Sequence, residues 1–343
     1  MGRIIENLTI KRPSINYGFV NSANGVVIRN LIISDEVKSI DSRYLNGRVT
    51  IKNYIVDPKN KYYTCVDGVL FTKDMKHLVA YPRRHNKLFT YEVPQGVEVI
   101  EDEEFAYQYY LTKISFPDSL KVISRMAFLF CKRLEEVTIP ASVLEIDSLA
   151  FRLMPKLKKV LVDSSNPYFF DDGGVVYSRN PQKLVCYPNG KRDKTYKIIE
   201  GTKEILPHVF YQQNFIKEIE MPDSLSIVGA RAFMYAEELT TIKFSPNIIE
   251  LGEFAFSGCS KLSEINWQDS FTQQEELEGI FCSCEGLSVV NNFPDEMCAR
   301  MFYSHKHLRE HGMKPHVSQS LFWGSPFAKE IAKRQAKYRN KDV

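Results

Sequence analysis

Cysteine and histidine, side chains that commonly bind zinc, gather near the C-terminal end of this 343-residue chain. The group comprises Cys282, Cys284, Cys298, His305, His307, His311 and His316. Zinc sites favour paired ligands a few residues apart, and the spacing here matches no standard zinc arrangement. Cys284 and His305 also fall on a position of the sequence repeat described below. We therefore predict neither a metal site nor a cofactor.

An acidic pair, Asp171-Asp172, precedes Gly173-Gly174 and raises the possibility of calcium binding. A solvated Asp-Gly turn explains the same residues, and we favour it. The sequence has no G-x-S-x-G, Walker A, G-x-G-x-x-G or H-E-x-x-H motif. It also offers no nucleophile with a recognisable base. The sequence therefore predicts that the protein is not an enzyme.

A fixed period organises the chain. Ile114, Val137 and Val160 are 23 residues apart, and Phe128 and Phe151 repeat at the same interval. A period of this length is typical of a solenoid, in which each repeat covers the apolar face of the next.

One repeat explains how a coil would fold. Leu134, Val137 and Ile139 follow the L-x-x-L-x-L spacing of leucine-rich repeats. Val137 to Ile139 alternates as a short half-buried strand, and Ala150-Phe151 is expected on one turn of helix. A strand and a helical turn in every coil predict an α+β repeat solenoid. The spacing recurs at Leu111, Leu157, Ile216, Leu239 and Leu262, and looser copies include Phe281 and Phe302.

A longer repeat lies over the short one. Residues 57–100 and 163–201 both carry a Gly turn, a β-rich run and then L-V-x-Y-P. This punctuation predicts a β-hairpin insert in each segment. We expect an N-terminal cap over residues 1–30, a solenoid over 31–308 and a basic tail or capping helix over 309–343. Within the cap, Asn24-Gly25 is typical of a hairpin turn.

Three motifs carry a family resemblance: I-P-A-S-V-L-E-I-D-S-L-A-F (139–151), P-D-S-L-S-I-V-G-A-R-A-F (222–233) and F-S-G-C-S-K-L-S-E-I (256–265). The chain resembles the BspA-like family of leucine-rich repeat proteins over roughly residues 31–308. The resemblance implies a solenoid with β-hairpin inserts that recognises proteins or surface ligands, without enzymatic activity. Members of the family are often displayed on bacterial cell surfaces.

The seven cysteines show no disulfide framework. Cys131, Cys259 and Cys284 all lie three residues after the repeat Phe, where Met154 and Ala236 stand in other copies. A slot shared with Met and Ala predicts buried, reduced cysteines used for packing. This weakly favours a reducing compartment.

The outward strand positions are the predicted binding residues. They are Ser115, Thr138, Leu161, Glu220, Lys243 and Asn266. Their mixed charge suits a protein or glycan partner, and a net charge of +3 argues against nucleic acid. Tyr107, Tyr109 and Tyr110 form a second candidate surface, since tyrosine gives a large contact area at low entropy cost. The alternative is that these tyrosines pack against the insert hairpin.

The cellular compartment is predicted from apolar segments and from the N-terminal residues. No apolar run is long enough to span a bilayer, and the first residues lack the apolar region of a signal peptide. As the chain stands we expect a cytoplasmic protein. The resemblance implies a cell-surface or secreted adhesin or structural spacer instead, with its signal removed.

The C-terminal tail is basic. From Ser304 onward the sequence has nine Lys and Arg but only three Asp and Glu. The tail therefore either caps the solenoid or binds a membrane, an acidic partner or nucleic acid.

Overall fold

The computed structural model describes residues 3–16, 26–42, 45, 49–83, 89–266 and 279–291. The chain divides into two compact units. The first comprises Met1–Val176 with Pro188–Gly190, and the second comprises Tyr177–Tyr187 with Lys191–Val343. The predicted C-terminal helix and the histidines after residue 291 lie outside the described residues, as does the repeat copy at Phe302.

Parallel strands build the N-terminal part of the first unit. They are β1 (Ile4–Ile10), β2 (Ser14–Ile15), β3 (Val27–Ile33), β4 (Ser39–Ile40), β5 (Thr50–Ile51) and β6 (Tyr54–Val56). Ile4 of β1 is in register with Val27 of β3, which is the 23-residue period again. β3, the strand that follows the predicted hairpin turn at Asn24-Gly25, runs parallel to β1. The two turn residues themselves lie outside the described part of the chain.

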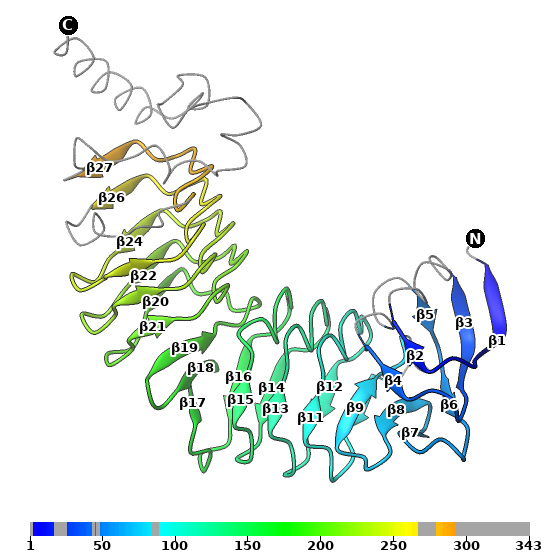
Figure 1. Cartoon of the computed structure of the whole chain (residues 1–343). Helices are drawn as coiled ribbons and strands as arrows, with labels where there is room; N and C mark the ends of the chain where they lie inside the picture. The colour runs from blue at the N-terminus through cyan, green and yellow to red at the C-terminus, as the bar shows by residue number, and fades with distance from the viewer. Residues whose placement is uncertain are drawn as a thin grey trace, which may run out of the picture. The chain divides into compact units, whose positions relative to one another are not determined.

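Later coils contribute strands to two rows (Figure 1). We call the first row the strand ribbon. In the first unit it comprises β10 (Thr90–Glu92), β12 (Lys113–Ser115), β14 (Glu136–Ile139) and β16 (Lys159–Val162). In the second unit it comprises β20 (Thr195–Lys197), β22 (Glu218–Glu220), β24 (Thr241–Lys243), β26 (Glu264–Asn266) and β27 (Val289–Asn291).

The second row consists of shorter strands, which we call the short-strand row. In the first unit it comprises β9 (His77–Ala80), β11 (Val99–Ile100), β13 (Val122–Ile123) and β15 (Glu145–Ile146). In the second unit it comprises β19 (Lys183–Cys186), β21 (Glu204–Ile205), β23 (Ile227–Val228) and β25 (Glu250–Leu251). Neighbouring coils pair in parallel, as in Val99 with Val122 and Val122 with Glu145.

Leu45 has a helical backbone, but every regular element whose bounds the structure describes is a strand, so the predicted α+β class is wrong. Ala150 and Phe151 lie in a turn. Backbone hydrogen bonds between coils explain why no helix forms there, because the Phe128 amide donates to the Ala150 carbonyl at 2.8 Å. The turn also contains Leu153 with a φ of +56°, a left-handed conformation that interrupts a right-handed helix. A repeat solenoid of leucine-rich type still fits the structure.

Stacked phenylalanine rings form the centre of each unit. In the first, Phe128 lies between Phe105 and Phe151, with ring centroids 5.2 and 5.4 Å apart and planes within 8° of parallel. In the second, Phe233 lies between Phe210 and Phe256 at 4.6 and 4.9 Å. All of these rings are buried. The 23-residue period therefore aligns one aromatic side chain per coil.

Two hairpins interrupt the coils, as the longer repeat predicts. β7 (Tyr63–Val66) pairs antiparallel with β8 (Val69–Thr72). The counterparts are β17 (Phe169–Asp172) and β18 (Val175–Ser178), which are neighbours in their sheet.

Candidate functional site

The strand ribbon presents one set of side chains inward and the other outward. In β14, Val137 and Ile139 are buried, whereas Glu136 and Thr138 are exposed. Ser115 on β12 is exposed in the same way, and Leu161 on β16 is half-buried. In the first unit the structure therefore places Ser115 and Thr138 on the outer face, with Leu161 less accessible than the alternation predicts.

In the second unit the outward positions are linked by charge. Glu220 of β22 accepts from Lys197 of β20 at 3.0 Å and from Lys243 of β24 at 3.3 Å. Hydrogen bonds from Lys197 and then Lys243 lower the pKa of Glu220 below its usual value. Lys243 and Asn266 are exposed. Two of the predicted binding residues thus interact with each other, which sequence alternation alone does not show.

The tyrosine cluster lies in the loop that leads into β12. Tyr107 stacks on Phe130 with ring centroids 5.3 Å apart, and the guanidinium of Arg83 lies 4.8 Å from the Tyr107 ring centroid. Tyr109 and Tyr110 are 41% and 44% exposed. Tyr107 is therefore mainly a packing residue, while Tyr109 and Tyr110 are available at the surface.

Two cations beside this cluster were not recognised in the sequence. The Lys132 ammonium lies 5.0 Å from the Tyr109 ring centroid, and the Arg133 guanidinium lies 5.5 Å from the Tyr110 centroid. These residues occupy the loop before β14, so strand alternation does not point to them. Cation–π contact is most favourable within about 6 Å, and both contacts fall inside this limit.

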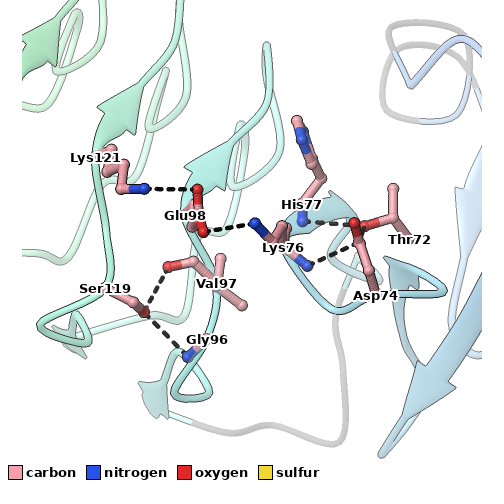
Figure 2. Close-up of polar contacts among 9 residues, drawn as sticks. All are labelled: Thr72, Asp74, Lys76, His77, Gly96, Val97, Glu98, Ser119 and Lys121. Atoms are coloured by element: carbon pink, nitrogen blue, oxygen red, sulfur yellow. Dashed lines mark hydrogen bonds and ion pairs between the residues drawn. The ribbon is translucent and has the colours of Figure 1, made fainter.

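The short-strand row of the first unit carries a different polar network (Figure 2). Glu98 accepts from Lys76 of the preceding coil at 3.0 Å and from Lys121 of the following coil at 2.9 Å. Hydrogen bonds from Lys121 and Lys76 lower the pKa of Glu98. The network joins three successive coils side by side and so stabilises the repeat.

A shallow pocket of about 430 Å³ lies near this network. Its lining residues are Ile40, Asp41, Ser42, Tyr63, Thr72, Val79, Glu101 and Asp102. Glu101 interacts with His77 at 2.5 Å, and Asp102 accepts from the Arg125 amide at 3.2 Å. These contacts already occupy two of the pocket's carboxylates.

The residues considered for metal binding have other partners. Asp171 accepts from the Val162 amide at 2.9 Å and from the Gly174 amide at 3.0 Å, as expected of an Asp-Gly turn. The Cys284 thiol is buried and donates to the Phe256 carbonyl at 3.1 Å. Within the part of the chain that the structure describes, no group of three or more His, Cys, Asp or Glu could hold a metal ion.

Comparison with known proteins identifies the coils. The model of the BspA type leucine rich repeat region matches residues 83–172 and 203–325, in six copies. The chain belongs to this family.

Two solved structures are similar to this chain in fold. A leucine rich cell surface protein from Faecalibacterium prausnitzii is 25% identical, with a TM-score of 0.61 over 83% of this chain and 76% of that one. The pneumococcal vaccine antigen PcpA is 21% identical, with a TM-score of 0.58 over 87% of this chain and 77% of that one. No curated protein matches the sequence. Among the described residues, no helix has the length and apolar character needed to cross a bilayer.

The serine of the BspA-type P-x-S motif has a structural role. Ser119 accepts from the Gly96 amide at 3.0 Å and donates to the Val97 carbonyl at 2.8 Å, so it joins its own coil to the previous one (Figure 2). Ser224 makes the equivalent bonds to Gly201 and Thr202 in the second unit. The serines of this motif thus hold neighbouring coils together.

Proposed function

We propose that this chain is a non-catalytic recognition module that binds a protein or glycan partner through the strand ribbon. The observation that supports this is the exposed outer face of the ribbon, whose side chains differ from strand to strand while the inward side chains repeat. Inward positions bury the apolar surface that joins each coil to its neighbours. Ser115, Thr138, Glu220, Lys243 and Asn266 are the residues proposed to contact the partner.

The proposed setting is a bacterial cell surface, where the module acts as an adhesin or as a spacer that presents its ribbon. The similarity to a leucine rich cell surface protein supports this setting. A cell-surface module meets many macromolecules and needs selectivity, which a ribbon of mixed charge provides through electrostatic match.

The test uses the purified chain on arrays of extracellular proteins and of glycans. One variant combines Thr138→Lys with Asn266→Lys on the ribbon. A control matched in charge, Glu145→Gln with Glu250→Gln, changes exposed residues of the short-strand row instead. We expect the ribbon variant to lose at least about tenfold in affinity for the array members that bind the wild type, and the control to retain it. No micromolar binding to either array, or equal binding by both variants, would overturn the proposal.

A further inference from the structure

Four cations on the ribbon side of the first unit have no carboxylate partner among the described residues. They are Lys113 of β12, Lys132 and Arg133 of the loop before β14, and Lys159 of β16, and all four are exposed. None forms an ion pair with a described residue, unlike Lys158 nearby, which binds Glu135 at 2.9 Å. The first unit therefore presents four cations that no described carboxylate holds in an ion pair.

Exposed aromatic rings lie beside two of these cations. The Lys132 ammonium lies over the face of the Tyr109 ring, and the Arg133 guanidinium lies over the face of the Tyr110 ring. Tyrosine and arginine are enriched at the energetic centres of protein–protein interfaces, because each combines apolar area with directed polar groups. Positive charge and accessible aromatic area thus occur on the same surface.

The second unit reverses the charge at every equivalent position. Residues 105 positions later in the chain are glutamates: Glu218, Glu237, Glu238 and Glu264 stand where the first unit has Lys113, Lys132, Arg133 and Lys159. β22 is the counterpart of β12 and β26 the counterpart of β16, so the reversal falls on equivalent places in the coil. The second unit also pairs ribbon charges internally, through Glu220 with its two lysines and Glu238 with Lys261. At these four positions, exposed cations without an ion pair to a described residue therefore occur in the first unit and not in the second.

Acidic residues within the ribbon limit the kind of anion that fits. Glu136 of β14 stands between Lys113 and Lys159 in the same outward column. Glu136 and Lys159 are partners in the pairing of β14 with β16, and paired strands are about 4.8 Å apart. A ligand that crosses the column therefore meets positive, negative and positive charge in turn. A uniform polyanion such as nucleic acid or a sulfated glycan would be repelled at the middle strand. A polypeptide with separated acidic residues would not.

The surface formed by Lys113, Lys132, Arg133, Lys159, Tyr109 and Tyr110 is, we propose, a docking site for an acidic segment of a partner protein. The proposal rests on the proposed function and names the part of the ribbon and the ligand chemistry. Aspartate or glutamate side chains bind the four cations, and an apolar or aromatic residue of the segment packs on the two tyrosines. The second unit repels the same segment through the glutamates at the equivalent positions.

A displayed peptide library, selected on the whole chain, provides the probe. We expect enriched peptides to carry several Asp and Glu with an aromatic or apolar residue among them. The variant Lys132→Glu/Arg133→Glu copies the residues that the second unit has at these positions, so the coil is expected to tolerate it. It should lower the affinity of enriched synthetic peptides at least about tenfold. The matched control Glu237→Lys/Glu238→Arg should not lower it.

Separate outcomes distinguish the inference from the proposed function. Enriched peptides without excess acid, peptides that bind the Lys132→Glu/Arg133→Glu variant fully, or failure to enrich any peptide would overturn the inference. Ribbon-dependent binding on the protein or glycan arrays would still support a recognition module in each of these cases. A heparin column and a labelled DNA duplex complete the test. Tight retention on either one that the same variant abolishes would identify a polyanion site in place of a protein site.

Discussion

Asn60 and Asn166 lie 106 residues apart, and their side chains make equivalent sets of four hydrogen bonds. Each of the two residues is only 1% exposed. The Asn166 amide nitrogen donates to the carbonyls of Pro140 and Val143, and its oxygen accepts from the amides of Tyr168 and Phe169. The Asn60 side chain bonds to Ser34, Val37, Tyr62 and Tyr63 in the same pattern. Each asparagine thus attaches one hairpin insert to the coil before it.

Replacing Asn166 with Asp should destabilise the first unit. The carboxylate keeps the acceptor but loses both donors, and each buried carbonyl left without a donor costs about 1–3 kcal/mol. We expect a loss of about 2–5 kcal/mol in the free energy of unfolding, measured in urea. Asn214→Asp, at an exposed position, is the control and should change little. Equal stability of the two variants would contradict the anchoring role.

Phe128 is expected to be among the most sensitive positions for stability. Its ring is fully buried between Phe105 and Phe151. Phe128→Ala should cost about 3–5 kcal/mol, since it leaves a cavity in the ring stack. Phe233→Ala should behave alike in the second unit, because its ring has the same neighbours one module later. Phe89→Ala, at a ring that is 48% exposed, serves as the control, and a comparable loss there would show that ring burial is not the cause.

The sequence predicts the parts of the fold that depend on residue type. Inward strand residues, the stacked phenylalanines and both hairpins follow from apolar spacing and glycine turns. The helical turn at Ala150-Phe151 could not be excluded from local pattern, because the competing bond comes from Phe128 in the preceding coil.

The candidate site was predictable only in part. The alternation of apolar and polar residues gives the outward strand positions. It does not show that Glu220 and Lys243, on the neighbouring strands β22 and β24, form an ion pair. Lys132 and Arg133 lie in a loop, where periodicity assigns no direction to a side chain. A position-by-position comparison of the two modules at an offset of 105 residues is the sequence signal that finds them.

The repeat cysteines should react slowly with thiol reagents. Cys131 and Cys259 are fully buried, and each donates to the carbonyl of a repeat phenylalanine. Burial raises the pKa of the Cys131 thiol to about 12, so the reactive thiolate is scarce at neutral pH. Iodoacetamide labelling of native protein, followed by mass spectrometry, should modify the half-buried Cys65 and Cys282 first. Labelling of Cys131 as fast as Cys65 would contradict this expectation.

The ion network at Glu98 should make stability depend on pH. The folded pKa of Glu98 is lowered, so its stabilising contribution is present above the unfolded value of about 4.3 and is lost as pH falls through the folded value. Glu98→Gln should therefore lower the unfolding temperature at pH 7, and the difference from wild type should narrow below about pH 4.3. Glu145→Gln, on the same row and without an ion pair to a described residue, is the control. A difference that stays constant down to pH 3 would exclude this origin.

The network of Lys197, Glu220 and Lys243 predicts how the unfolding temperatures of charge-reversed variants rank. Reversing Glu220 and Lys243 together keeps an opposite-charge pair between these positions but places a second positive charge beside Lys197, 3.0 Å from the present carboxylate. The double variant should therefore unfold at a lower temperature than wild type. Adding Lys197→Glu restores alternating charge on all three strands and should recover most of the loss. The charges are exposed, so salt near 1 M, where the Debye length is about 3 Å, should remove the differences. Differential scanning calorimetry at low and high salt measures both effects. A double variant as stable as wild type at low salt, or a triple variant no better than the double, would show that these residues do not act as one network.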